Sequence, residues 1–229
     1  MPIFFDPTIV LLIPAIIFSL YAQMKVKSTF NKYSNVKSQS GITGAQVAER
    51  LLRNYGIHHV KIERIENKLG DHYDPKAKAL RLSPDVHDSS SLAALGVAAH
   101  EAGHAIQHSV GYMPLEVRAN LAPVAQIGSF AAFPLLIIGV LFASPPLLQI
   151  GIYAFVGVVL FHLVTLPVEY NASNRAVALL QSSGFISRSE AGQTKKVLNA
   201  AALTYLAAAL AAVITLLRFL ILSYLLGEE

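Results

Sequence analysis

Four long apolar stretches constrain the fold of this chain more than any other feature of its sequence. They cover residues 7–23, 121–143, 147–167 and 200–226. A helix needs about 20 apolar residues to cross the hydrocarbon core of a bilayer, and each stretch has nearly or fully that length. Hydrophobic residues form 54% of the chain and charged residues only 14%, whereas about 25% of a soluble domain is charged. We therefore expect a mainly α-helical membrane protein with about four transmembrane helices.

The basic residues predict how these helices are oriented. With the spans placed as above, every Lys and Arg except Arg218 falls on one side of the membrane. The positive-inside rule makes that side the cytoplasm, with both termini outside. Arg218 is costly in lipid and should face the helix bundle or reach toward the interface. We expect an integral, multi-pass protein of the cell (plasma) membrane, in contact with the lipid bilayer.

The overall charge and the missing cysteines narrow the range of partners and ligands. The net charge of +4 is explained by this topology, so we expect no nucleic-acid partner. The chain contains no cysteine, which excludes disulfides and thiolate metal ligands. Any metal would therefore be held by histidine and carboxylate side chains.

The four spans divide the chain into five predicted segments. Most of the charge lies between the first and second spans, so this region should form a small α+β domain in the cytoplasm. The second and third spans are joined by Ser144-Pro145-Pro146, and this short joint predicts an antiparallel helical hairpin. The expected segments are a first transmembrane helix (1–23), the cytoplasmic domain (24–118), the transmembrane hairpin (119–168), a cytoplasmic helical segment (169–199) and a fourth transmembrane helix with the C-terminus (200–229).

Local patterns predict the first elements of the cytoplasmic domain. Thr43-x-x-Gln46 is a capping box that begins an amphipathic helix, and Gly56 can end it. Val60 and Ile62 alternate with polar neighbours, which predicts a strand. This part of the domain should therefore contain one helix followed by one strand.

The next elements lead up to a second helix of the domain. Residues 71–75 resemble a turn, and the alternation in 76–82 predicts a second strand. Serines 89–91 supply an N-cap for a helix over 92–109, which Gly111 can close. The second strand could offer its edge to an extended peptide or form an ordinary two-stranded hairpin, and the sequence leaves both open.

The helix over 92–109 carries the run His100-Glu101-Ala102-Gly103-His104. Positions four apart project from one face of a helix, so His100 and His104 can hold one metal ion. Glu101, one step round, can reach a water on that metal and take its proton. This is the chemistry of zinc-assisted peptide hydrolysis. Alternatively, the two histidines bind no metal and only form hydrogen bonds on a helix face. The small residues around them favour a metal site, because they allow close helix packing around it.

A catalytic zinc site needs a third protein ligand, and Glu169 is the best candidate. The predicted hairpin leaves the cytoplasmic face after the HExxH helix and returns to it within two residues of Glu169. The competing interpretation is an interfacial salt bridge from Glu169 to Arg175. His108 lies one turn beyond His104 on an unbroken helix and cannot easily reach the same ion, so it should be a neighbouring or surface residue. His162 is expected to take part in helix packing.

These residues also carry a family resemblance. HEAGHAIQH, the downstream VEYNASNRA and the upstream DHYDPKAKALRLS, flanked by spans, closely resemble YugP-type neutral zinc metallopeptidases, which are similar to the HtpX-like membrane gluzincins. The resemblance implies a zincin-like cytoplasmic domain with His100, His104 and Glu169 as zinc ligands and Glu101 as general base. In the HtpX-like motif an aspartate usually stands where this chain has Ser173, followed by Asn174. A neutral residue there should make the ligand histidine less basic.

The expected function is that of a zinc metalloendopeptidase with one Zn²⁺ per chain and a peptide or protein substrate, which can itself be a membrane protein. The chain lacks the phosphate-binding loop of ATP-dependent membrane metalloproteases, whose HEAGHA string it shares. His72, Tyr73 or Arg175 could stabilise the oxyanion, and the sequence does not choose between them. The rival hypothesis is a non-enzymatic membrane scaffold or small transporter with an incidental HExxH.

Overall fold

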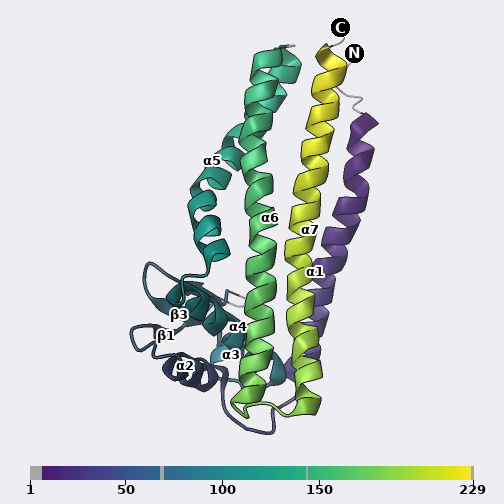
Figure 1. The fold of residues 1–229 in the computed structure, drawn as a ribbon. Coiled ribbons are helices and arrows are strands. Elements are labelled where there is room, and N and C mark those ends of the chain that lie inside the picture. Colours follow the sequence, from purple (N-terminus) through teal and green to yellow (C-terminus); the bar gives the residue numbers. More distant parts are fainter. Residues whose placement is uncertain (1–6, 68–69, 143, 228–229) are drawn as a thin grey trace. The chain divides into compact units, whose positions relative to one another are not determined.

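A computed structural model describes residues 7–67, 70–142 and 144–227 of the chain. Ala143, at the end of the second predicted span, lies outside the described residues, as do 1–6 and 228–229 in the two terminal segments. The fold is mainly helical, as predicted, with one small sheet (Figure 1). Contacts divide the chain into two compact units. The first holds the apolar helical stretches and the second holds the sheet and the HExxH helix.

Four helices are long and apolar enough to cross a membrane, as the sequence predicted. A short 3-10 helix, Pro7–Leu11, leads into the first of them. The four are α1 (Leu12–Ser34), α5 (Met113–Leu141), α6 (Pro145–Ser182) and α7 (Arg188–Gly227). Each extends beyond the apolar stretch that predicted it, because α1 and α6 continue after the stretch ends and α5 and α7 begin before it starts. Only the apolar part of each helix is therefore needed to cross a membrane.

The first unit consists of the apolar parts of these helices, packed through aromatic rings and small residues. The rings of Phe133, Phe155 and Phe219 meet edge to face, with centroids 5.6–5.9 Å apart. This is the favoured geometry for aromatic pairs. Within the same unit Arg218 donates a hydrogen bond from Nε to Thr8 Oγ1, 3.2 Å away. The one charge in the fourth apolar stretch thus faces other helices, as expected.

The predicted cytoplasmic helical segment 169–199 is helical, but a turn divides it into two parts. Helix α6 continues through Pro167 to Ser182, and α7 begins only at Arg188. Between them Gly184 adopts φ +71°, and Phe185 N–H donates to Leu180 O, the hydrogen bond of a Schellman cap. Ser187 and Glu190 then form a reciprocal capping box at the start of α7. The chain therefore reverses in the middle of the predicted segment.

The second unit is built around helix α4 (Leu92–Ser109), whose bounds match the prediction. Ser91 caps it by accepting a hydrogen bond from Ala94 N–H. Helix α2 (Gly44–Asn54) packs against α4 and begins with both bonds of the predicted capping box. The short helix α3 (Pro84–His87) completes the approach to α4. Leucine and isoleucine side chains from α2, α4 and the sheet form one fully buried core.

The sheet differs from the prediction in strand number and order. Its strands are β1 (Lys61–Arg64), β2 (His72–Asp74) and β3 (Ala79–Leu82), in the order β1-β3-β2. β3 is parallel to β1 and antiparallel to β2. The strand predicted over 76–82 is therefore central, so it is neither an edge nor half of a two-stranded hairpin.

The predicted turn over 71–75 contains strand β2. The reversal lies just after it, where Asp74 Oδ1 accepts hydrogen bonds from the N–H groups of Lys76 and Ala77, each at 2.9 Å. This local carboxylate turn brings β2 back beside β3. The outer edges of β1 and β2, rather than an edge of β3, have no partner strand among the residues that the structure describes.

Close packing of α2 depends on Gly44. A Cβ built on Gly44 would lie 2.3 Å from the carbonyl oxygen of Val86. We expect Gly44→Ala to cost about 1–3 kcal/mol of unfolding free energy, because a backbone atom must move. The measurement is the midpoint of thermal unfolding of the detergent-purified chain.

Gly192 in α7 provides the matched control, since a Cβ there has no neighbour within 4 Å. Gly192→Ala should leave the midpoint unchanged or raise it, because alanine favours a helix by up to about 1 kcal/mol. Equal midpoints for the two variants would contradict the proposed close packing.

Candidate metal centre

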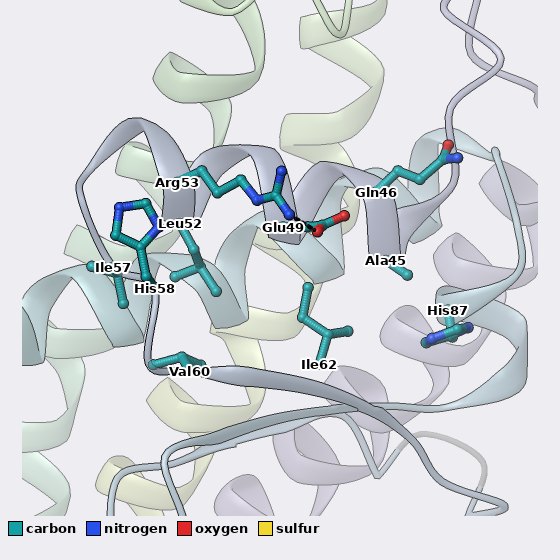
Figure 2. Close-up of a pocket in the computed structure, with 10 residues that line it drawn as sticks. All are labelled: Ala45, Gln46, Glu49, Leu52, Arg53, Ile57, His58, Val60, Ile62 and His87. Carbon is teal, nitrogen blue, oxygen red and sulfur yellow. Dashed lines mark hydrogen bonds and ion pairs between the residues drawn. The ribbon is translucent and has the colours of Figure 1, made fainter.

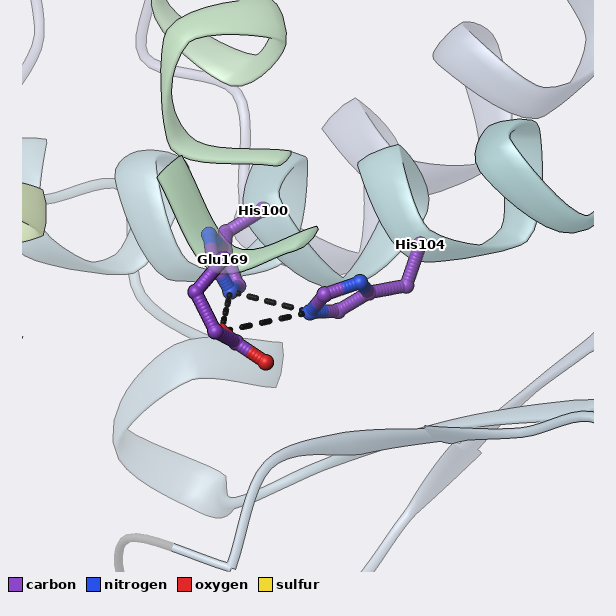
Figure 3. Close-up of side chains that lie close together, drawn as sticks. All are labelled: His100, His104 and Glu169. Carbon is purple, nitrogen blue, oxygen red and sulfur yellow. Dashed lines mark hydrogen bonds and ion pairs between the residues drawn. The ribbon is translucent and has the colours of Figure 1, made fainter. Parts of the chain in front are cut away.

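Three side chains from two helices converge in the second unit (Figure 3). His100 and His104 project from one face of α4, and Glu169 comes from α6. The Nε2 atoms of the two histidines lie 3.1 Å apart. Oε2 of Glu169 lies 3.2 Å from His100 Nε2 and 3.6 Å from His104 Nε2. The structure thus brings together the three residues that the sequence analysis selected as ligands.

The geometry of these three atoms fits a tetrahedral zinc ion. Imidazole nitrogen and carboxylate oxygen bind zinc at about 2.0–2.2 Å, which places two ligands of one tetrahedron about 3.3–3.6 Å apart. The observed separations of 3.1, 3.2 and 3.6 Å are close to this range. Two nitrogens and one oxygen are also the donor set that suits zinc. The residues present therefore fit the metal.

Gln107 fixes the orientation of His104. Its side chain is completely buried, and its Nε2 donates to Val168 O and to Asn171 Oδ1, both at 2.9 Å. These two acceptors determine which way the amide points, so Oε1 faces His104 Nδ1 at 2.9 Å. His104 must then donate from Nδ1, which leaves the lone pair of Nε2 directed toward Glu169. Gln107 is therefore a link between a ligand on α4 and the backbone just before Glu169.

Ser173 contacts Nδ1 of His100, as Gln107 contacts Nδ1 of His104. Its hydroxyl lies 3.1 Å from His100 Nδ1. This is the opposite side of the ring from the ligand triangle, the group formed by His100 Nε2, His104 Nε2 and Glu169 Oε2, which are candidate ligand atoms. Ser173 is four residues after Glu169, so one face of α6 supplies both the carboxylate and this hydroxyl. The neighbour of the ligand histidine is thus uncharged, as the residue type at this position requires.

Small residues allow α4 and this part of α6 to approach closely. A Cβ on Gly103 would lie 3.2 Å from the carbonyl oxygen of Ala172. Glu169 is buried to 1% exposure at this contact. A carboxylate removed from water needs compensating partners, and the two imidazoles provide them.

Glu101 lies beside the triangle on α4. Its side chain is buried, and its Oε2 accepts a hydrogen bond from Tyr73 N–H on β2 at 3.1 Å. Burial raises the pKa of the Glu101 carboxyl, and the imidazoles of His100 and His104 oppose that rise. The contact to Tyr73 shows that the unpaired edge of β2 faces this carboxylate.

The other residues considered in the sequence analysis lie around the triangle or apart from it. Tyr73 Oη is 3.0 Å from His108 Nδ1, so His108 pairs with a tyrosine outside the ligand group. His72 is exposed, with Nδ1 2.7 Å from Gly70 O. Arg175 Nε is buried and forms no hydrogen bond within the described part of the chain. His162, in α6, is not one of the clustered ligands.

A hollow of about 700 Å³ in the same unit lies between α2 and the strand region. Figure 2 shows Leu52 and Ile62 on its wall, with His58 and His87 at opposite ends. None of the three clustered metal-binding candidates is among its lining residues. The chemistry of this unit is therefore concentrated at the ligand triangle rather than in this hollow.

Comparison with known proteins agrees with the donor set. Residues 8–224 match the protein family described as "Putative neutral zinc metallopeptidase". The chain belongs to this family. It is also 46% identical over 221 residues to the "Putative membrane protease YugP" of Bacillus subtilis (strain 168), a match that covers 96% of this chain and 98% of that relative. No solved structure matches the chain.

The family resemblance predicted from the motifs is thus confirmed. Gln107 is a residue of this candidate metal site that the sequence analysis did not select. A weak signal was present, because Gln107 is a polar residue three positions after a ligand histidine in a helix of mostly small and apolar residues. Its partners at Val168 and Asn171 are 61 and 64 residues away, and only the folded chain reveals them.

We expect Gln107→Leu to weaken zinc binding by about 10–100-fold, because partners that orient a ligand histidine have effects of this size. The measurement is the zinc dissociation constant of the detergent-purified chain, obtained by competition with a chelator. Ser109→Ala is the matched control, since Ser109 is on the same helix and its hydroxyl donates to the nearby Ile106 O. Wild-type affinity in Gln107→Leu would show that the link does not support the site.

Proposed function

We propose that this chain is a zinc-dependent membrane metalloendopeptidase of the gluzincin type. The observation that carries the proposal is the ligand triangle of His100, His104 and Glu169 with a buried carboxylate, Glu101, beside it. The family description and the name of the Bacillus subtilis relative point to the same class of enzyme. The rest of the proposal assigns a task to each side chain.

His100, His104 and Glu169 would hold one zinc ion per chain. A zinc ion bound there supplies Lewis acidity, which lowers the pKa of a coordinated water to near neutrality and polarises a peptide carbonyl. Gln107 and Ser173 keep the two imidazoles aimed by hydrogen bonds to their Nδ1 atoms. The histidines then need no rearrangement to present Nε2.

Glu101 is the proposed general base. Its carboxylate takes the proton of the attacking water and later gives it to the leaving amine, so one residue serves both proton transfers. Burial favours its protonated form, which helps it to retain the proton between these transfers. The hydrogen bond from Tyr73 N–H holds the carboxylate in place.

The substrate is proposed to bind in an extended form along the unpaired edge of β2. That edge faces Glu101 through Tyr73 N–H, and an extended peptide can add to such an edge by backbone hydrogen bonds. Of the three oxyanion donors considered, Tyr73 is favoured because its residue directly contacts the proposed base. Its hydroxyl is already aligned by His108.

The proposed site lies in a small zincin-like domain on the cytoplasmic side of the cell membrane. The support is the charge distribution, in which every Lys and Arg except Arg218 falls on one side of the four apolar stretches. Substrates would be peptides or proteins that reach this face, membrane proteins included.

Two substitutions test the function by separating metal binding from catalysis. Glu101→Gln should lower the turnover of a labelled unfolded protein such as casein by about 10²–10⁴-fold, the usual contribution of a general base. Zinc content should remain near that of the wild-type chain. Glu169→Ala should lose zinc as well as activity. Metal analysis and turnover are measured on the same detergent-purified preparations.

The exposed Glu116 on α5 offers a control, because Glu116→Gln removes a carboxylate that lies outside the cluster. It should keep both zinc and turnover. If Glu101→Gln kept full turnover, Glu101 would not be the general base. If the zinc-loaded wild-type chain cleaved no substrate, the chain would be better described as a scaffold or transporter. If Glu169→Ala kept its zinc, Glu169 would not be a ligand.

The orientation can be tested with single cysteines, since the chain has none of its own. Asn54→Cys in α2 should react with a membrane-impermeant maleimide only after cells are opened, because we place it in the cytoplasm. Pro146→Cys, at the joint of α5 and α6, should react in intact cells. Both positions are exposed. The reverse labelling pattern would overturn the assignment.

A further inference from the structure

A second hollow, of about 750 Å³, lies in the same unit among α1, α6 and α7. We call it the basic groove. Its α1 wall is formed by Lys25, Ser28, Thr29 and Lys32, which share one helix face through their spacing of three and four residues. Its α7 wall has the same spacing and is formed by Lys196, Asn199, Ala200 and Leu203.

The charge of the basic groove is unbalanced. Three of its lining residues are lysines and none is acidic. No ion pair involves Lys25, Lys32 or Lys196 among the residues that the structure describes. Lys32 Nζ lies over the ring of Tyr33, 5.6 Å from its centroid. The groove therefore offers three cationic groups without internal anions to neutralise them.

Neutral donors accompany the lysines. The lining residues also include Asn199, Thr29, Tyr33 and Tyr170, whose side chains carry amide or hydroxyl donors. The ring of Tyr33 is buried, yet within the described ranges its hydroxyl makes no hydrogen bond. Ammonium groups together with hydroxyl and amide donors match the oxygens of a phosphate.

The groove lies where two helices change from polar to apolar. Along α1, Lys25 comes three residues after Ala22, the last residue of the apolar unit in that helix. Along α7, Leu203 is the last residue before the apolar unit resumes. A ligand in the groove would thus meet lysine ammonium groups together with the aliphatic side chains of Ala200 and Leu203.

We propose that the basic groove binds the phosphate headgroup of an anionic phospholipid. Lysines near a membrane often only record topology, but such lysines need no shared hollow. Here three helices place lysines and neutral donors around one concavity beside aliphatic residues, which is the form of a pocket for a lipid headgroup. The proposal does not depend on peptidase activity.

The groove also touches the helix turn that carries a metal-ligand candidate. Tyr170 lines the groove and directly follows Glu169 on α6. The two side chains point in different directions from adjacent positions, one toward the groove and one toward the histidines. A bound headgroup would therefore contact the same turn of α6 that presents the carboxylate.

The chain contains no tryptophan, so Tyr170→Trp introduces a single fluorescent reporter on the groove wall. The full chain with this change is reconstituted in phosphatidylcholine vesicles that contain either brominated phosphatidylglycerol or brominated phosphatidylcholine, both of which quench tryptophan. We expect stronger quenching by the anionic lipid, with a relative association constant of at least about fivefold. Equal quenching by the two lipids would overturn the proposal.

A matched pair of double variants separates the groove from general surface charge. Lys25→Gln with Lys196→Gln, made in the Tyr170→Trp chain, should remove most of the preference, at roughly fivefold for each lysine. Lys27→Gln with Lys195→Gln removes the same charge from the same helices at exposed positions outside the groove. This pair should retain the preference for the anionic lipid. Equal loss in both pairs would overturn the groove as the binding site.

A last arm distinguishes a lipid headgroup from free phosphate. Millimolar inorganic phosphate should leave quenching by brominated phosphatidylglycerol unchanged, because the aliphatic side chains of Ala200 and Leu203 contribute to lipid binding. Abolition of the preference by inorganic phosphate would overturn a lipid as the occupant. Zinc content and circular dichroism, equal to those of the wild-type chain, establish that each variant is folded.

Discussion

The site depends on one buried amide. Gln107 accepts from a ligand histidine on α4 and donates to the backbone carbonyl immediately before Glu169 on α6. Because the amide is completely buried, any loss of one partner leaves a polar group without water to replace it. One side chain thus joins α4 to α6 and selects the tautomer of His104, a candidate metal ligand.

Helix ends and periodicities were readable from the sequence because their causes are local. The capping box at Thr43, the N-cap at Ser91 and the bounds of α4 follow from residues within one turn, and the apolar stretches predicted all four long helices. The Schellman glycine and the capping box between α6 and α7 are equally local signals, which the sequence analysis did not use. A proline inside a long apolar helix did not end it.

Strand order and the partners of Gln107 could not be read in this way, because they are decided by contacts between distant residues. The alternation in residues 76–82 predicted a strand but not that β1 and β2 would pair with its two sides. The three-residue strand β2 is too short to show alternation. The sequence selected the four residues at the centre of the candidate site, whose roles remain a prediction, yet it did not indicate the hydrogen bonds that orient them.

The charges of the site argue for a divalent ion in particular. Two carboxylates, Glu101 and Glu169, are buried near each other. Burial raises the pKa of Glu101, and the charge on Glu169 adds to that rise. Two imidazoles that donate from Nδ1 are neutral when their Nε2 atoms bind a metal. One doubly charged cation therefore balances both carboxylates, whereas a monovalent ion would leave one net negative charge in a buried setting. Ser173, the neighbour of His100 Nδ1, is uncharged and adds nothing to this sum.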